Sequence, residues 1–139
     1  MIVLDTNVLS EILRPAPDSR VMAWLALQPR AALFTTTVTE AEILYGVRLL
    51  ADGSRKEALS IAIEDIFDKD FADRLLSFDS DAAAMYADIA ASRRNSGRPI
   101  SQFDAMIAAV TKSRGATLAT RNVKDFVNCG VAIVDPWAT

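Results

Sequence analysis

Short apolar runs alternate along the chain with stretches in which apolar residues recur at helical spacing. Residues 2–4 form an apolar run that predicts a strand, and Thr6 and Asn7 are expected to cap a helix over residues 8–13. Residues 33–37, rich in β-branched and aromatic side chains, predict a second strand. By the same criteria we expect further strands at Phe78, 116–120 and 131–134, and further helices at 18–28, 39–50, 54–76, 79–95, 101–114 and 123–127.

This alternation of strands and helices predicts an α/β fold, a parallel sheet with helices on both faces, formed by one domain over residues 1–139. Phe103, Ile107 and Val110 recur at the spacing of one helix face, so we expect all three in the core. Gly46 is expected to allow close packing between helices. In such sheets ligands bind beyond the carboxyl ends of the strands, which is where functional residues are to be sought.

The composition narrows the chemistry that this fold can perform. Apolar residues make up 51% and charged residues 24% of the chain, as in an ordinary folded domain. The single cysteine, Cys129, excludes an internal disulfide. The lack of histidine removes zinc sites built from Cys and His and the commonest general base. An enzyme with this composition must use carboxylates.

The charge distribution limits how the chain can meet a nucleic acid. A formal net charge of −3 argues against a broad basic surface, so any contact with RNA must be local. Arg93, Arg94 and Arg98 form a basic cluster, and acidic residues gather between 64 and 73. Charged helix faces are common in folded proteins, so we interpret both groups as solvated surface.

The apolar stretches are too short for a membrane protein. No uncharged apolar run approaches the ~18 residues that a spanning helix needs. The first residues lack a positively charged region ahead of an apolar stretch, so we expect no signal peptide. We therefore expect no membrane association and a place in the cytoplasm, whose reducing conditions suit a single free thiol.

Acids and amides lie at or near the ends of the predicted elements. Asp5 directly follows the first strand, and Glu42 is expected in the first turn of the helix after the second strand. Asp104 is expected in the first turn of the helix before the penultimate strand, and Asn122 and Asp125 follow that strand. Because the carboxyl ends of parallel strands share one edge of the sheet, at least three of these segments can meet there.

Carboxylates gathered in one cleft raise each other's pKa unless a cation neutralises them. Mg²⁺ and Mn²⁺ favour such all-oxygen surroundings and keep several waters when they bind. A cation of this kind lowers the pKa of a bound water and stabilises charge that develops on a phosphate. Hydrolysis of a phosphodiester needs both effects, and neither requires histidine.

The same acids also fit a purely structural interpretation. Thr39-x-x-Glu42 matches a capping box, and Ser101-x-x-Asp104 is a shorter version of it. Asp5 is also well placed to cap a helix. From the residues alone, capping and metal binding both remain open for each of these acids.

Four segments, taken in order, resemble the motifs of PIN-domain ribonuclease toxins of the VapBC type. They are residues 2–9 (IVLDTNVL), 39–46 (TEAEILYG), 104–109 (DAMIAA) and 120–126 (TRNVKDF). The closing Asp135-Pro136-Trp137 resembles the FitB-like branch in particular. The segments span nearly the whole chain, which makes the resemblance far more specific than a lone Asp-Thr-Asn after a strand.

The resemblance implies the toxin of a toxin–antitoxin pair: an endoribonuclease that depends on Mg²⁺ or Mn²⁺ and is a homodimer or a dimer of dimers. It implies an antitoxin protein whose DNA-binding part brings the complex to its operator DNA, so that DNA is reached only through the antitoxin. By motif position, the metal-binding acids fall on Asp5, Glu42 and Asp104. Asn122 or Asp125 takes the fourth catalytic position, because relatives have an acid where this chain has Asn122.

Two other functions compete with this one. A phosphatase with Asp5 as a covalent nucleophile would need an acid two residues later, where this chain has Asn7. A catalytically silent PIN-like module would use its acids to cap helices or to bind an arginine of an antitoxin partner. Titration with Mn²⁺ in a calorimeter separates the metal-dependent nuclease from the silent module, because a protein whose acids only cap helices gives no stoichiometric heat.

Overall fold

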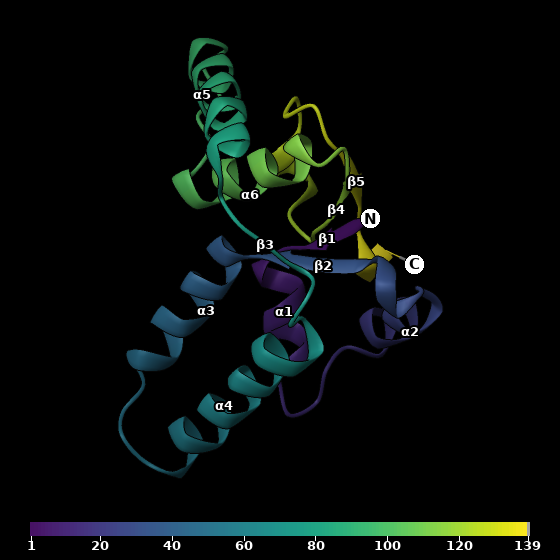
Figure 1. Cartoon of the computed structure of the whole chain (residues 1–139), viewed down its shortest axis with the longest axis vertical. Coiled ribbons are helices and arrows are strands. Elements are labelled where there is room, and N and C mark those ends of the chain that lie inside the picture. The colour runs from purple at the N-terminus through teal and green to yellow at the C-terminus, as the bar shows by residue number, and fades with distance from the viewer. Residues whose placement is uncertain (139) are drawn as a thin grey trace.

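A five-stranded parallel sheet lies at the centre of the protein, in the order β3-β2-β1-β4-β5. A computed structural model describes residues 1–138 (Figure 1). The strands are β1 (Ile2–Leu4), β2 (Leu33–Thr36), β3 (Leu75–Leu76), β4 (Thr117–Ala119) and β5 (Ala132–Val134). Val3 of the central strand pairs with Phe34 on one side and Leu118 on the other, so all neighbouring carboxyl ends point the same way.

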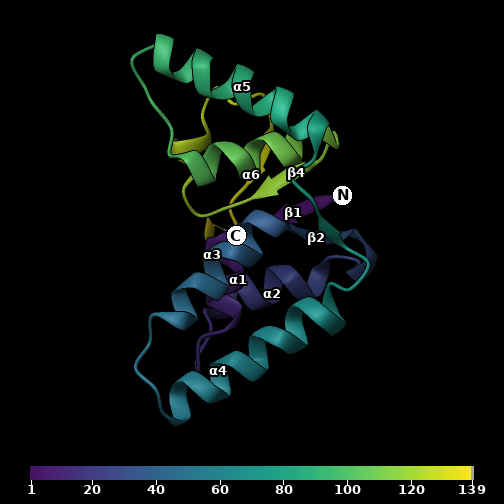
Figure 2. The ribbon, with the colours of Figure 1, turned by 60° about the vertical axis from the view of Figure 1, so that its left-hand side comes forward.

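Helices cover both faces of the sheet, as the alternating pattern predicted. On one side lie α1 (Thr6–Ile12), α2 (Ser19–Leu27), α3 (Thr37–Arg48) and α4 (Ser54–Asp65), and on the other α5 (Ser80–Asn95) and α6 (Gln102–Ser113) (Figures 1 and 2). Side chains alternate across a strand, so Leu4 joins the core beneath α1 and α4 while Val3 joins the core beneath α5 and α6. The predicted α/β class is confirmed.

The starts of α2, α4, α5 and α6 agree with the sequence to within one residue, and those of α1 and α3 differ from it. Asp18, Asp79 and Ser101 cap α2, α5 and α6 as expected. The expectation that Thr6 and Asn7 cap the first helix is wrong, because α1 already includes them and Asp5 is its cap.

The second strand is one residue shorter than expected, and α3 begins at Thr37 with Thr36 as its cap. The Thr36 hydroxyl accepts a hydrogen bond from the backbone N–H of Thr39 at 3.0 Å. Thr39 is therefore a helical residue whose N–H is capped, and the proposed capping box does not form. Glu42 consequently lies in the second turn of α3.

The expected helix over residues 54–76 is too long. α4 ends at Asp65, a wide π turn follows over Ile66–Asp70, and the third strand is Leu75–Leu76, ahead of the expected Phe78. Pairing of Thr35 with Leu75 explains the change. Backbone groups of β2 at the sheet edge find hydrogen-bond partners in this strand, which they would lack if the helix continued.

Three side chains lie where the pattern did not place them. Ile107 and Val110 are buried, but Phe103 is 48% exposed because it sits in the first turn of α6, at the rim of the packed layer. Gly46 has open space beside it and does not mediate close packing. Arg93 is buried, unlike the rest of its basic cluster.

Trp24 and Trp137 are buried in the core. No helix within residues 1–138 has the length and apolar character needed to cross a bilayer.

Candidate active site

Asp5 stands where the central strand ends and α1 begins. One oxygen of its carboxylate accepts a hydrogen bond from the N–H of Val8 at 3.1 Å, which caps the helix, and the residue is 3% exposed. Burial raises the pKa of Asp5 from 3.8 to about 6, and the charge of Asp104 adds to the rise. Hydrogen bonds from Thr120 and Val8 oppose the rise in pKa but do not cancel it. Asp5 therefore caps a helix and remains costly to ionise.

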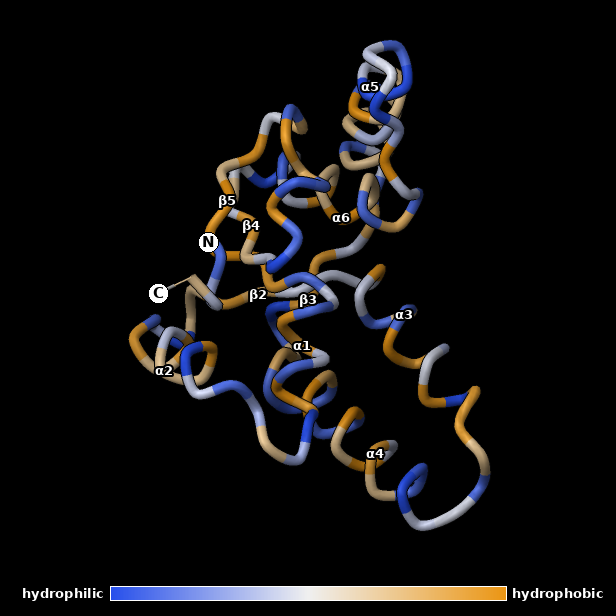
Figure 3. The backbone as a smooth tube through the Cα atoms, turned by 180° about the vertical axis from the view of Figure 1, so that it is seen from behind, coloured by the Kyte–Doolittle hydropathy of each residue, from blue (hydrophilic) through white to orange (hydrophobic). Residues whose placement is uncertain are grey.

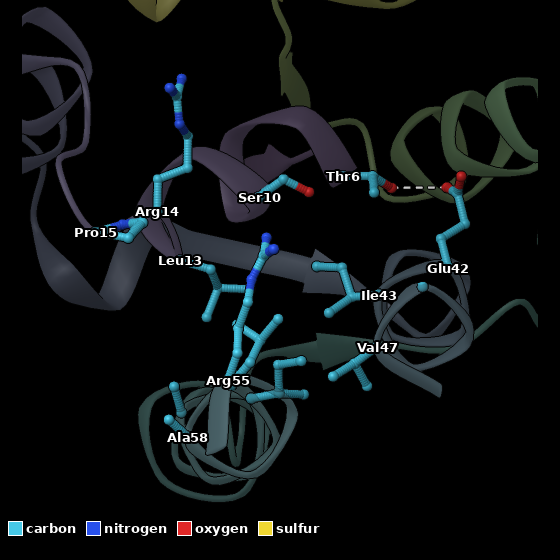
Figure 4. A pocket seen from close by; sticks show the side chains of 14 residues that line it. Thr6, Ser10, Leu13, Arg14, Pro15, Glu42, Ile43, Val47, Arg55 and Ala58 are labelled. Carbon is cyan, nitrogen blue, oxygen red and sulfur yellow. Dashed lines mark hydrogen bonds between the residues drawn. The ribbon is translucent and has the colours of Figure 1, made fainter. Parts of the chain in front are cut away.

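Glu42 reaches from α3 towards the start of α1. Its Oε1 accepts a hydrogen bond of 2.7 Å from the hydroxyl of Thr6 (Figure 4). The hydroxyl oxygen of Thr6 is also 3.1 Å from that of Thr39. Burial raises the pKa of Glu42, the bond from Thr6 lowers it and the charge of Asp104 raises it. Because Glu42 makes this contact from the second turn of α3, helix capping does not explain it.

Asp104 lies in the first turn of α6. Its backbone N–H donates to the hydroxyl of Ser101 at 3.3 Å, which leaves Ser101 as the cap. Burial raises the pKa of the Asp104 side chain, a hydrogen bond with Ser101 lowers it, and the charge of Asp125 raises it. The acids of α6 and of the segment after β4 are thus close enough to influence each other.

One cavity of about 270 Å³ joins the predicted site residues. Its lining consists of Asp5, Thr6, Asn7, Glu42, Ser101, Phe103, Asp104, Ile107 and Asn122. We call this cavity the acid pocket. It brings together Asp5, Glu42, Asp104 and Asn122, whereas Asp125 lies outside its lining and acts on Asp104 through its charge.

The chemistry of the acid pocket suits a hydrated hard cation. Its charged groups are all carboxylates, and each of the three has a pKa raised by burial, which a bound cation would reverse. Among residues 1–138, no three His, Cys, Asp or Glu side chains converge closely enough to form a ready-made metal cluster. Mg²⁺ is commonly held by one or two carboxylates and several waters, so these residues fit it without closer convergence.

A second, larger cavity of about 600 Å³ adjoins the acid pocket. It runs between α1, α3 and α4, with Leu13, Ile43 and Val47 among its apolar lining residues (Figure 4). Thr6 and Glu42 line both cavities and mark the end where they meet, and Arg14 lies at the opposite end. We call this cavity the α1–α3–α4 groove.

Sequence reasoning missed the hydroxyl groups and the aromatic ring of the pocket. Thr6 orients Glu42, and Thr120 donates to Asp5 besides accepting from the N–H of Asn122 at 3.1 Å. Both threonines follow strands at the same edge as the acids, and that position was the available signal. Phe103 was assigned to the core because it has helical spacing with Ile107 and Val110. That spacing does not reveal that the first turn of α6 lines the pocket.

The chain belongs to the PIN domain family, whose pattern matches residues 2–128. It is 41% identical over 137 residues to the toxin FitB of Neisseria gonorrhoeae, covering 99% of each chain. It is 37% identical over 137 residues to the VapC ribonuclease Y4jK of Sinorhizobium fredii, covering 99% of this chain and 98% of the relative. In the structure of FitAB bound to the IR36 DNA fragment, the matching chain has a TM-score of 0.91 and 41% identity, covering 99% of this chain and 96% of that one.

Proposed function

We propose that this protein is a metal-dependent endoribonuclease and the toxin of a toxin–antitoxin pair, acting in the cytoplasm. The observation that carries the proposal is the acid pocket, in which carboxylates from three elements share one cavity of about 270 Å³ and each has a raised pKa. The names of the relatives, a toxin and a VapC ribonuclease, support the same activity.

In this mechanism Asp5, Glu42 and Asp104 hold Mg²⁺ or Mn²⁺, directly or through waters. The chemistry supplied by a cation bound there is a water of lowered pKa and stabilisation of charge on the phosphate. Asp5 is fixed by the cap of α1, and Glu42 is fixed by the hydroxyl of Thr6 at 2.7 Å. The protein thus presents its acids in place before the RNA arrives, which limits the reorganisation that cleavage requires.

We assign the fourth catalytic position to Asn122 and Asp125 together, with different roles. Asn122 lines the acid pocket, so its amide is placed to meet RNA or a water there. Asp125 raises the pKa of Asp104 from outside the lining, so its contribution is electrostatic. We expect Asp125→Asn to lower activity modestly.

The partner that inhibits the enzyme is an antitoxin protein, through which the complex reaches operator DNA. The α1–α3–α4 groove, of about 600 Å³, suits an apolar antitoxin segment. Its junction with the acid pocket at Glu42 suits a basic side chain on that segment, and Arg14 and Arg55 suit acidic ones. A mode of inhibition follows in which the antitoxin occupies the groove and blocks the acids.

We further propose that the toxin is a homodimer or a dimer of dimers. Several large apolar side chains are strongly exposed in the single chain, among them Leu27 at 81%, Leu49 at 68% and Ile61 at 61%. Apolar stretches recur along α3 and α4 between polar ones (Figure 3). A stable pair should bury roughly 800 Å² on each partner. Light scattering should give at least twice the 15.1 kDa of one chain, and a lasting monomer at tens of micromolar would contradict this.

The ribonuclease proposal is tested by RNA cleavage with and without metal. Cleavage should require Mg²⁺ or Mn²⁺ and stop in EDTA, because no other group here activates water. Asp104→Asn should lower the rate by at least about a hundredfold, as expected for loss of a metal-binding acid.

Asp79→Asn is the matched control. Asp79 caps α5 by accepting from the N–H of Ala82 at 3.0 Å and lies outside the acid pocket, so the amide should cap equally well and leave cleavage intact. Full activity in chelator, or in the Asp104 variant, would refute the mechanism. Absence of stoichiometric heat with Mn²⁺ would favour the silent binding module instead.

A further inference from the structure

The guanidinium of Arg93 is buried near the C-terminal end of α5, and its partners are mainly backbone carbonyl oxygens. Arg93 is 7% exposed, and within residues 1–138 no ion pair joins it to a carboxylate. A buried cation is stable only if its donors find acceptors, so the partners of this side chain are held to it tightly.

Arg93 joins two segments that are far apart in the sequence. Its Nε donates to the carbonyl of Arg98 at 2.7 Å, in the loop between α5 and α6. Its Nη1 donates to the carbonyls of Asp125 at 2.8 Å and Val127 at 3.0 Å, and lies 3.4 Å from the sulfur of Cys129. One side chain therefore connects the loop that leads into α6 with the segment that follows β4.

Both of these segments carry acids of the site. The loop that contains Arg98 leads to Ser101, the cap of α6, and Asp104 follows in the first turn. The segment after β4 holds a short 3-10 turn, Val123–Phe126, and Arg93 donates to carbonyl oxygens at the C-terminal end of that turn. The charge of Asp125 reaches Asp104 across this junction.

We propose that Arg93 is a positioning residue of the nuclease, which sets where Asp125 stands relative to Asp104. The inference rests on the ribonuclease function proposed above and adds a residue outside the acid pocket to its machinery. Lysine at this position keeps the charge but not the planar fork of donors, so it cannot reach all the carbonyls in the same arrangement.

Arg74 provides a matched control for a purely structural role. Its guanidinium also binds carbonyls, those of Arg30 and Leu33 at 2.6 Å and that of Asp70, but at the start of β2, opposite the carboxyl edge. Arg74→Lys should therefore lower the melting temperature and leave kcat and KM unchanged.

The experiment measures RNA cleavage with Mn²⁺ for Arg93→Lys, Asp125→Asn and the double variant, well below their melting temperatures. Arg93→Lys should lower kcat about fivefold, no more than Asp125→Asn itself does, and change KM for RNA by less than about twofold, because it displaces an acid and no RNA contact. In the Asp125→Asn background the same substitution should change kcat by less than about twofold, because both act through one side chain. Hydrogen exchange should rise in residues 122–129 of Arg93→Lys and not of Arg74→Lys.

Two kinetic results would overturn the inference. One is a folded Arg93→Lys protein with wild-type kcat. The other is a loss of kcat on Arg93→Lys substitution that is as large in the Asp125→Asn background as in the wild type. Arg93→Gln is the second variant if lysine prevents folding, and failure of both to fold would leave Arg93 with a structural role alone. If the wild type cleaves no RNA with any divalent metal, the ribonuclease proposal fails, and this inference fails with it.

Discussion

The carboxylate of Asp5 caps α1 and is at the same time buried. Capping α1 needs only an acceptor for the N–H of Val8, whereas burial opposes ionisation and raises the pKa of Asp5 from 3.8 to about 6. The folded protein therefore binds this proton more tightly than the unfolded chain does. The stabilisation that protonation gives is complete below about pH 4 and is lost as the pH rises through 6.

The metal-free protein should consequently lose stability relative to Asp5→Asn as the pH rises. The amide keeps the cap and does not titrate, so the difference in free energy of unfolding between the two proteins should change by about 2 kcal/mol between pH 4 and pH 8. Urea unfolding at a series of pH values, without metal, measures this difference. If the free energies of unfolding of the two proteins change in parallel with pH, burial does not raise the pKa of Asp5.

The acids of the site could be predicted from the sequence, but the contacts that hold them could not. Asp5, Glu42 and Asp104 are each close to an element end, and element ends at one edge of a parallel sheet converge. The bond between Thr6 and Glu42 joins residues 36 positions apart and depends on how α1 packs against α3. The burial of Arg93 likewise depends on a segment more than 30 residues further along the chain.

At the scale of elements, Gly46 lies in α3 at a position where neither backbone conformation nor packing requires glycine. Gly46 lies inside the helix without positive φ, and an added Cβ would meet no atom within 4 Å. Gly46→Ala should therefore raise the free energy of unfolding by about 0.5–1 kcal/mol, because alanine loses less conformational entropy in a helix. Thermal unfolding of the metal-free protein should show a melting temperature a few degrees higher.

A larger side chain at Gly46 tests partner binding separately from stability. Gly46 lines the α1–α3–α4 groove, so Gly46→Leu should narrow the groove and weaken binding of the antitoxin segment, while RNA cleavage stays near wild type. Lower stability of Gly46→Ala would show that the open space beside the residue is filled in solution.

Elements with a clear cap or a longer apolar run were predicted well, and the two-residue strand at the sheet edge was not. Asp79 marks the start of α5 because its side chain caps locally, which the sequence alone displays. The third strand was missed because two residues, Leu75 and Leu76, become a strand only when β2 lies beside them. The early start of α3 has a related cause: Thr37 has a residue type typical of strands, and the cap at Thr36 places it in the helix.

For the molecule as a whole, binding of a metal should be coupled to folding and to pH. A cation that binds only the folded state at about 100 times its dissociation constant adds about 2.7 kcal/mol to the free energy of unfolding. In the proposed site the cation would bind ionised carboxylates and would therefore compete with the proton on Asp5, whose pKa is about 6. Protonation of Asp5 in the metal-free fold thus works directly against the metal.

Stabilisation by Mn²⁺ should for this reason be full near pH 8 and smaller near pH 5. About one in ten Asp5 side chains is ionised a pH unit below a pKa of 6, which weakens apparent metal binding about tenfold, or about 1.4 kcal/mol. Melting temperatures with saturating Mn²⁺ and with EDTA, taken at both pH values, measure the two gains in the wild type and in Asp5→Asn. The variant should show little gain at either pH, since it has lost the ligand. An equal gain for the wild type at both pH values would show that the cation binds elsewhere, because only a site that includes Asp5 must displace that proton.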